Sequence, residues 1–252
     1  MVEPTAVAEG YQIESQVESE ADWKAVTPGP MLLMGAPGVG KGTQAKGIMA
    51  VWGIPQISTG DLLRDHRQRG TSLGAQATGL MDSGKLVSDD LVNQMVAERL
   101  QQPDTVRGYI LDGYPRTLAQ AEWLDQRLAA APGALPLIAV SIQVSYNQLL
   151  RRITGRRNCP TCQLIYNVYL QPPKFDTVCD KDGTPLIQRA DDVETVFHER
   201  MRTYAALTAP VVEHYRAGSR FVEVDGEQSA DKVMTDILAG VARLRSQSLR
   251  ES

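Results

Sequence analysis

The fold of this chain is decided by residues 31–43, which read Met31-Leu32-Leu33-Met34-Gly35-Ala36-Pro37-Gly38-Val39-Gly40-Lys41-Gly42-Thr43. The four apolar residues predict a buried strand, and the residues from Gln44 onward predict the start of a helix. A glycine-rich turn between a strand and a helix points several backbone N–H groups into one concavity, with the positive end of the helix dipole behind it. The spacing G-x-x-x-x-G-K therefore predicts a phosphate-binding loop with Lys41 as its cation, rather than an ordinary glycine-rich turn.

The loop departs from the general phosphate-loop pattern at one position. The residue directly after the lysine is Gly42, and the hydroxyl residue Thr43 comes one position later. This order weakens the interpretation that the hydroxyl binds Mg²⁺ as it does in GTPases. A GTPase would also carry an N-K-x-D motif to read its base, and the sequence has none. A phosphate-loop hydrolase of that class is therefore disfavoured.

Composition indicates a globular protein with an acidic N-terminal segment. The 252 residues are 42% hydrophobic, mean hydropathy is −0.24, and no apolar run approaches the length of a membrane helix. Six acidic residues and one basic residue fall within 1–29, so the other 25 basic and 24 acidic residues leave a body of net charge +1. A near-neutral body argues against broad nucleic-acid binding. Residues 1–29 resemble neither a secretory signal nor a transit peptide, and predict a disordered or loosely attached tail.

An alternative for this tail is a short partner-binding element. Its few large apolar residues, Tyr11, Ile13, Val17 and Trp23, would then form the contact surface. The sequence leaves the two interpretations open.

Apolar runs alternate with helical patterns along the rest of the chain. Strands are predicted at 31–34, 54–58, 109–112, 137–142 and 220–224, and helices at 61–69, 89–101, 117–130, 146–154, 191–216 and 230–246. This alternation predicts an α/β fold of three layers with a central parallel five-stranded sheet. Ligands of such sheets bind beyond the carboxyl ends of the strands, where Gly35, Ser58, Asp112 and residues 141–144 fall.

Two segments interrupt the alternation and predict insertions at the ligand-binding edge. Residues 58–87 contain helical patterns without a core strand, and residues 155–192 are rich in Cys, Pro and Asp around a β-like run at 164–169. We expect both to act as lids. The predicted division is therefore a tail (1–29), a core (30–57, 88–154 and 193–245), a first insertion (58–87), a lid (155–192) and a C-terminal tail (246–252).

Two polar motifs follow predicted strands. Ser58-Thr59-Gly60-Asp61-Leu62-Leu63-Arg64 opens a helix that Ser58 or Thr59 can cap, with Arg64 one turn further on. In Asp112-Gly113-Tyr114-Pro115-Arg116 the acid ends a buried strand, where an unpaired carboxylate is costly. Asp112 is therefore predicted to serve a cation such as Mg²⁺; a structural salt bridge or helix cap is the alternative. Arg116 offers a bidentate fork to phosphate.

The lid adds arginines and cysteines. Six arginines border it, Arg151, Arg152, Arg156, Arg157, Arg189 and Arg200, which predicts a clamp for an anion rather than scattered surface charge. Cys159 and Cys162 form a C-x-x-C knuckle, and Cys179 and Asp182 repeat that spacing sixteen residues later. Two knuckles closing on one Zn²⁺ predict a structural site with three thiolates and one carboxylate. Three free thiols, or Asp180 as the fourth ligand, are the alternatives.

Taken together, these motifs resemble those of the adenylate kinase family. The resemblance covers about residues 30–245 and is carried by GAPGVGKGTQ, STGDLLR, GKLV, DGYPRT, the GRR before the lid, RADD and TAP. The lid length and the CPTC…CDKD pattern resemble the zinc-containing bacterial type with a long lid. The resemblance implies reversible phosphoryl transfer from Mg-ATP to AMP, giving two ADP.

The resemblance also implies roles for individual residues. ATP would contact Gly38, Val39, Gly40, Lys41, Gly42, Thr43, Arg156, Ile165, Tyr166 and, in the loop 225–228, Gln228. AMP would contact Thr59, Arg64, Lys85, Leu86, Val87, Gly113, Tyr114, Pro115, Arg116, Gln120, Arg189 and Arg200. The catalytic group would be Lys41, Arg116, Arg152, Arg156, Arg189 and Arg200, with Asp112 organising Mg²⁺ and Asp191 and Asp192 orienting the lid arginines. The zinc ligands would be Cys159, Cys162, Cys179 and Asp182.

The implied partners are ATP, AMP and ADP, with no nucleic acid and no membrane, and the implied enzyme is a cytoplasmic monomer. A kinase for another nucleoside monophosphate is the nearest alternative, because the side chains that shape the base pocket cannot be placed from sequence. A nucleotide-binding zinc-ribbon protein that contacts nucleic acid is a more distant one, and the body charge of +1 disfavours it.

Overall fold

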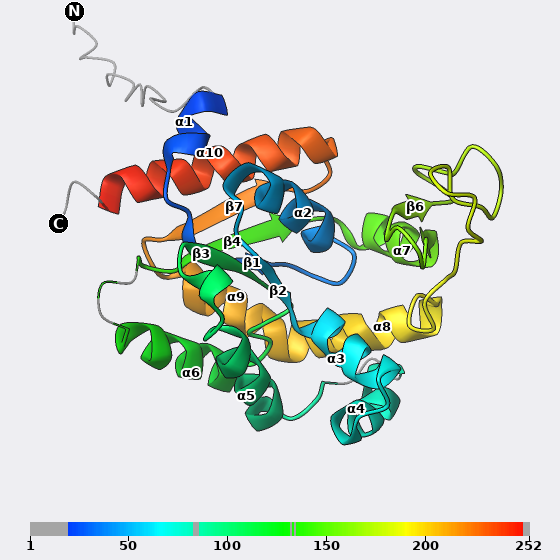
Figure 1. Ribbon diagram of the computed structural model, residues 1–252, viewed down its shortest axis with the longest axis horizontal. Helices are drawn as coiled ribbons and strands as arrows, with labels where there is room; N and C mark the ends of the chain where they lie inside the picture. The colour runs from blue at the N-terminus through cyan, green and yellow to red at the C-terminus, as the bar shows by residue number, and fades with distance from the viewer. Residues whose placement is uncertain (1–19, 83–85, 132, 134, 249–252) are drawn as a thin grey trace, which may run out of the picture.

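Five parallel strands form the centre of the molecule. The computed structural model describes residues 20–82, 86–131, 133 and 135–248 (Figure 1). The sheet order is β2-β3-β1-β4-β7, all parallel, with bounds β1 Gly29–Met34, β2 Gln56–Ser58, β3 Gly108–Asp112, β4 Ile138–Gln143 and β7 Phe221–Asp225. The predicted five-stranded parallel sheet is confirmed, and each strand falls within three residues of its predicted bounds.

Helices cover both faces of the sheet because alternate side chains of its strands point to opposite faces. In β1, Met31 and Leu33 pack with α2 (Lys41–Trp52) and α10 (Ala230–Ser248). Leu32 and Met34 pack with α5 (Asp89–Arg99), α6 (Leu118–Ala129) and α9 (Ala209–Arg216). Figure 1 shows these two helical layers above and below the sheet. The predicted three-layer architecture is therefore confirmed.

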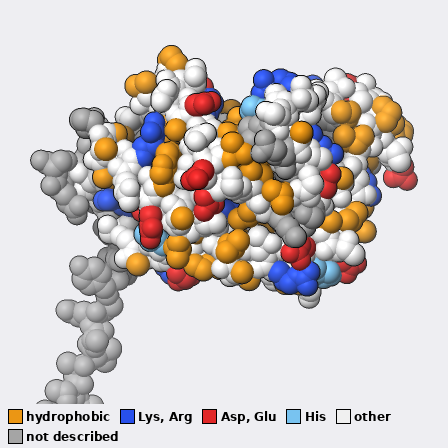
Figure 2. Space-filling view, turned by 90° about the horizontal axis from the view of Figure 1, so that it is seen from below, with side chains coloured by type: hydrophobic (Ala, Val, Ile, Leu, Met, Phe, Trp, Pro, Cys, Tyr) orange, Lys and Arg blue, Asp and Glu red, His pale blue; other side chains and the backbone are white. Residues whose placement is uncertain are grey.

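The two insertions project on the right in Figure 1. The first contains α3 (Thr59–Gln68) and α4 (Ser72–Asp82), which cross so closely that a Cβ at Gly74 would lie 2.3 Å from the His66 carbonyl oxygen. The lid follows α7 (Tyr146–Thr154) and contains the antiparallel pair β5 (Arg156–Asn158) and β6 (Ile165–Asn167). It exposes Tyr169, Phe175 and Ile187, in keeping with the hydrophobic side chains on the lobe at the right of Figure 2.

The helix predicted over 191–216 is interrupted. α8 (Glu194–Thr203) passes into a π-helical turn, η2 (Tyr204–Thr208), and then into α9. Pro210 has no N–H to donate to the preceding turn, which disfavours a continuous α-helix at this point. The turn lets the Thr208 hydroxyl donate to the backbone oxygen of Arg116 at 2.9 Å. A short 3-10 helix, η1 (Pro103–Thr105), precedes β3.

Both ends of the described chain contain more structure than the sequence predicts. Residues 20–25 form a helix, α1 (Glu20–Ala25), within the segment predicted to be a tail. Trp23 packs against the core, and its backbone oxygen accepts a hydrogen bond from Trp52 Nε1 at 2.7 Å. Tyr11, Ile13 and Val17 lie outside the described residues. At the other end, α10 continues to Ser248, two residues beyond the predicted helix.

A buried arginine contacts the amino-terminal ends of two central strands of the sheet. Arg245 of α10 is 3% exposed, and its guanidinium donates to the backbone oxygens of Pro28, Pro30 and Pro136 at 2.8, 3.1 and 2.5 Å. These carbonyls flank the starts of β1 and β4, so one side chain ties the last helix to two strands. No helix among the described residues has both the length and the apolar character needed to cross a membrane.

Candidate active site

The carboxyl ends of three strands meet at one cavity. Asp112, at the end of β3, pairs in register with Ser58 of β2 and Leu33 of β1. The glycine-rich loop that follows β1 therefore lies beside both polar ends. A cavity of about 720 Å³ opens here, between the core, the first insertion and the lid.

The cavity is lined by nearly every residue assigned above to nucleotides: Gly38, Val39, Gly40, Lys41, Gly42, Thr43, Thr59, Arg64, Leu86, Val87, Asp112, Gly113, Tyr114, Pro115, Arg116, Gln120, Arg152, Arg156, Ile165, Tyr166, Arg189, Arg200 and Gln228. Lys85 is the exception, because it lies outside the described residues. The chain thus brings together side chains that are up to 190 positions apart in the sequence.

The glycine-rich loop has the geometry expected of a phosphate cradle. α2 begins at Lys41, and the preceding Gly40 has a φ of 104°. Gly35 has a φ of 131°, and a Cβ there would lie 2.5 Å from the Ile142 backbone oxygen. The positive φ disfavours a larger residue at both positions, and at Gly35 the space excludes one as well. Lys41 Nζ donates to the backbone oxygens of Gly35 and Ala36 at 2.8 and 3.2 Å.

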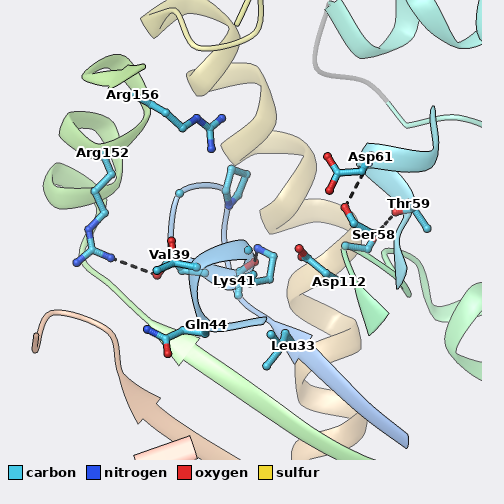
Figure 3. Close-up of a pocket in the computed structure, with 18 of the residues that line it drawn as sticks. Leu33, Val39, Lys41, Gln44, Ser58, Thr59, Asp61, Asp112, Arg152 and Arg156 are labelled. Atoms are coloured by element: carbon cyan, nitrogen blue, oxygen red, sulfur yellow. Dashed lines mark hydrogen bonds between the residues drawn. The ribbon is translucent and has the colours of Figure 1, made fainter. Parts of the chain in front are cut away.

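Lys41 and Asp112 carry opposite charges at the floor of the cavity (Figure 3). Burial lowers the pKa of Lys41 to about 8, although the charge of Asp112 acts in the opposite direction. Burial has the opposite effect on Asp112 and raises its pKa. The charge of Lys41 and a hydrogen bond of 2.8 Å from Gln56 Nε2 offset only part of this rise. A cation bound in the cavity would therefore stabilise the ionised form of Asp112.

The arginines of the cavity repel one another. Burial, followed by the positive charge of Arg200, lowers the pKa of Arg116 to about 10. Burial, followed by the charge of Arg156, lowers the pKa of Arg189 to about 10. Burial also lowers the pKa of Arg200, against the opposing effect of Asp191. Packing cations together costs free energy unless an anion joins them, so the cluster suits a polyphosphate.

Two neighbouring carboxylates hold two of these arginines. Asp192 is fully buried and accepts two hydrogen bonds from Arg156, one of them from Nε at 2.7 Å. Asp191 accepts from Arg200 Nη1 at 2.7 Å. Asp192 therefore holds a lid arginine, as the resemblance implied, whereas Asp191 holds an arginine of α8 instead.

Arg152 lies apart from this cluster. Its Nη1 donates to the Val39 oxygen at 3.2 Å and its Nη2 to the Gly226 oxygen at 2.7 Å, so it joins the phosphate loop to the loop 225–228. In Figure 3 it turns to the outer side of the loop, while Arg156 points toward the loop from above. The neighbouring Gln228 donates from Nε2 to the Asp225 oxygen at 3.1 Å and to Asp236 Oδ2 at 3.0 Å.

The opposite wall comes from the start of α3. Ser58 Oγ caps this helix by accepting from the Asp61 N–H at 3.2 Å, which confirms one of the two predicted caps. Thr59 is 3% exposed and donates from Oγ1 to the Gly113 oxygen at 2.8 Å. Arg64 pairs with Asp61, with one contact from Nε at 3.2 Å. The guanidinium thus turns back toward the helix start, as the spacing predicts.

The loop between β3 and α6 completes this wall. Arg116 Nε donates to the Gly113 oxygen at 2.7 Å, and the Arg116 N–H donates to Gln120 Oε1 at 2.7 Å. Tyr114 is 2% exposed, and its hydroxyl donates to Asn93 Oδ1 at 2.6 Å. The loop is therefore braced by its own backbone and by α5.

Sequence reasoning missed three polar residues at this site. Gln56 holds Asp112, Asp61 holds Arg64, and Asp89 holds Gln120 with a hydrogen bond of 2.7 Å. Gln56 carried a detectable signal, since it is the only polar residue before Ser58 in the predicted strand 54–58. Asp89 carried none, because its partner lies 31 positions away.

The lid gathers the four predicted metal ligands. One ligand atom from each of Cys159, Cys162, Cys179 and Asp182 lies within 4.8 Å of the other three. The Cys162 and Cys179 sulfurs are 3.5 Å apart, and Cys159 Sγ is 3.5 Å from Asp182 Oδ1. Tetrahedral zinc with Zn–S bonds of about 2.3 Å requires sulfurs about 3.8 Å apart. The Thr184 N–H donates to Asp182 and helps to lower the pKa of this carboxyl, which keeps it ionised. These four residues fit a structural metal ion.

Comparison with known proteins assigns the chain to a family. The family model for adenylate kinase matches residues 33–220. The adenylate kinase of Nitrosococcus oceani is 47% identical over 207 residues, covering 82% of this chain and 95% of the relative. That of Archaeoglobus fulgidus is 44% identical over 216 residues, covering 86% of this chain and 99% of the relative. The chain therefore belongs to the adenylate kinase family, whose enzymes transfer a phosphoryl group reversibly between ATP and AMP.

Proposed function

We propose that the cavity binds ATP and AMP end to end and transfers a phosphoryl group between them to give two ADP. One observation carries the proposal. A single cavity joins a phosphate loop on one wall to a second polar wall, and the cations of Lys41, Arg116, Arg156, Arg189 and Arg200 lie between the two. The triphosphate of ATP meeting the phosphate of AMP would offset the repulsion among these cations.

The ATP side is assigned to the phosphate loop and the lid. Gly38 to Thr43 would hold its phosphates, with Lys41 on the outer ones and the positive end of α2 behind them. Arg152 contacts the loop 225–228, which contains Gln228, and this region suits the base end of ATP. Ile165 and Tyr166 would cover the nucleotide from the lid.

The AMP side is assigned to the opposite wall. Arg64, Arg116, Arg189 and Arg200 would hold the AMP phosphate, which is the only anion of that nucleotide. Thr59, residues 85–87, Gly113, Tyr114, Pro115 and Gln120 would surround the nucleoside. Thr59 and Gln120 are almost completely buried and line the cavity, so they suit a ligand that is largely enclosed.

The chemistry needs no general base in this arrangement. The attacking atom is an oxygen of the AMP phosphate, which is already anionic at neutral pH. The charge that spreads over the transferring phosphoryl group would be neutralised by Lys41, Arg116, Arg156, Arg189 and Arg200. These cations would also hold the attacking AMP oxygen and the leaving oxygen of ATP in line. Asp112 fits the role of holding Mg²⁺ through water. That ion supplies further neutralisation of the ATP phosphates.

Water has to be excluded, since otherwise ATP would be hydrolysed. The first insertion (58–87) and the lid (155–192) flank the cavity, and we infer that they close over AMP and ATP respectively. We also infer that Zn²⁺ at Cys159, Cys162, Cys179 and Asp182 holds the lid in shape. The lid has few strands and a small core, so a metal ion would supply much of its stability.

A coupled assay of ADP formation tests the proposal. ATP should give ADP rapidly with AMP and far more slowly with GMP, CMP or UMP. A faster rate with another monophosphate would support the nearest alternative, a kinase for that nucleotide. Calorimetric titration with a non-hydrolysable ATP analogue, alone and with AMP, should show two separate sites. Finding one site under saturating conditions would exclude the transfer reaction.

We also infer a monomeric enzyme, which is what the family resemblance implies. Light scattering coupled to size exclusion would test that state. The cytoplasmic setting stays a prediction, and expression as a fluorescent fusion would test it.

A further inference from the structure

The Gln120 amide is held on both sides by polar neighbours. Its Nε2 donates to Asp89 Oδ1 at 2.7 Å, and its Oε1 accepts from the Arg116 N–H at 2.7 Å. The side chain is 2% exposed and lines the cavity. These contacts use one of the two amide hydrogens and one of the two lone pairs of the amide oxygen. One donor and one acceptor are left for a ligand.

The chemistry of the two neighbours fixes which end of the amide is which. An ionised carboxylate only accepts hydrogen bonds, and a backbone N–H only donates them. Rotating the Gln120 amide by 180° would set its oxygen against the carboxylate of Asp89 and its NH₂ group against the N–H of Arg116. Both contacts would then be repulsive, so only one orientation is stable.

Asp89 is itself held in place. It is the first residue of α5, where the helix dipole favours a negative charge. Its second oxygen, Oδ2, accepts from the Thr117 hydroxyl at 2.8 Å, and Thr117 also caps α6 by accepting from the Gln120 N–H at 3.2 Å. The carboxylate therefore ties the start of α5 to the start of α6, and neither oxygen is free to move away from its partner.

The orientation of this amide matters for a purine. Adenine offers an acceptor at N1 and a donor at its 6-amino group, whereas a 6-oxo purine offers a donor at N1 and an acceptor at O6. An amide locked in one orientation matches one of these orders and opposes the other. An amide free to rotate accepts both.

We propose that Asp89 is a positioning residue for base specificity. It locks the Gln120 amide so that its free N–H and free lone pair match a 6-amino purine and reject a 6-oxo purine. This inference rests on the assignment of Gln120 to the AMP nucleoside made above and takes its contact to be with the base. It adds the residue that sets the selectivity of that contact.

The test compares AMP with inosine monophosphate as acceptors, because their bases differ only at positions 1 and 6. The variant is Asp89→Asn, which keeps the shape of the side chain but lets it donate as well as accept. The ratio of kcat/KM for AMP to kcat/KM for inosine monophosphate should fall about tenfold. This is the size of effect expected when one hydrogen bond to a charged group is lost. Most of the change should lie in KM for the acceptor, and KM for ATP should stay the same.

Asp90→Asn is the matched control. It removes the same charge from the next position of α5, and Asp90 is exposed. The AMP to inosine monophosphate ratio should stay at the wild-type value in this variant. A general loss of structure in Asp89→Asn would lower both acceptor rates in proportion and leave the ratio unchanged.

Two results would overturn the inference: an unchanged ratio in Asp89→Asn, or the same fall in Asp90→Asn. A third variant separates this failure from failure of the underlying assignment. Gln120→Leu should raise KM for AMP strongly if Gln120 contacts the base. If it does so while Asp89→Asn keeps its ratio, only the positioning role is wrong. If Gln120→Leu leaves KM for AMP unchanged, the base assignment itself fails.

Discussion

The two ends of the parallel sheet use arginines in opposite ways. At the amino end, Arg245 of α10 is buried and donates to three backbone oxygens. At the carboxyl end, Arg116 uses Nε on the Gly113 oxygen, and the rest of its guanidinium lines the cavity near Arg200. Burial lowers the pKa of both Arg116 and Arg245 to about 10.

The pKa alone therefore does not separate a structural arginine from a functional one. What separates them is where the donors point. Arg245 donates to three backbone carbonyls and has Arg220 as a neighbouring cation, whereas Arg116 faces several cations across a cavity. The first arrangement stabilises the fold without a ligand, and the second is stabilised fully only when an anion arrives.

Arg116→Ala should produce the largest effect on catalysis. The variant lacks a cation that neutralises the transferring phosphoryl group. Its kcat/KM should be lower by about 10³-fold, as it is when comparable arginines are lost in phosphoryl transfer. The melting temperature should not fall, because repulsion with Arg200 is relieved. Steady-state kinetics and thermal melting check both parts. A folded variant with normal turnover would refute the functional interpretation of this end of the sheet.

Arg245→Met should produce the largest effect on stability. The variant keeps the aliphatic packing but leaves three buried carbonyls without donors, at a cost of about 3 kcal/mol or more. A loss of that size lowers the melting temperature by roughly 6–12 °C in a chain of this length. Turnover at low temperature should stay normal. Arg243→Met, an exposed position on the same helix, is the control and should melt like the wild type.

Cys162→Ala tests whether the lid depends on a metal ion as the core depends on Arg245. The variant should lose bound zinc, measured by plasma mass spectrometry, and melt several degrees earlier because metal binding contributes to folding. It should still catalyse in the cold. A chelator should lower the melting temperature of the wild type and leave that of the variant unchanged. Equal melting of the wild type with and without chelator would argue against the metal site.

Arg152→Ala and Arg156→Ala sharpen the comparison within the site. Arg152 donates to two backbone oxygens, so its loss should raise KM for ATP about tenfold and change kcat little. Arg156 is held by Asp192 beside the cation cluster, so its loss should lower kcat about 100-fold. Separate measurements of kcat and KM decide the matter. The reverse pattern would move Arg152 to the transferring phosphoryl group, where sequence resemblance put it.

The smallest expected effect is a pH dependence of ATP binding. The pKa of Lys41 is lowered to about 8 by burial, and the lysine has to be protonated to hold phosphate. ATP affinity should therefore be constant below pH 8 and fall by at most tenfold for each unit above it. Isothermal titration in buffers of different ionisation enthalpy would measure the proton taken up. In Lys41→Arg the dependence should disappear, since a guanidinium stays charged throughout this range.

The parts of the structure that could be predicted from sequence are those set by local patterns. The apolar runs of the five strands and the glycine-rich loop of residues 35–43 determine their own conformation, and the sheet followed from their alternation. α1 could not be predicted, because its six residues are held by tertiary contacts such as that of Trp23 with Trp52. The break between α8 and α9 had a signal in Pro210, but one that a long helical pattern obscured.

At the candidate site, the motifs predicted which residues gather but not how each one is used. Arg152 and Arg156 lie four positions apart and look alike in the sequence, yet one joins two loops and the other faces the cation cluster. Asp89 depends on a contact across 31 positions. Such details follow from three-dimensional packing, which a single sequence does not specify.

Arg245 also constrains the order in which the molecule can be completed during synthesis. Its contact with Pro28 spans 217 positions, so this contact can form only after residue 245 has left the ribosome. The residues of the catalytic cavity are all translated before that point. A nascent chain stalled before α10 would hold every group needed for chemistry, but the amino end of its sheet would still lack the contacts of Arg245. Chaperones and proteases are well placed to recognise such a state.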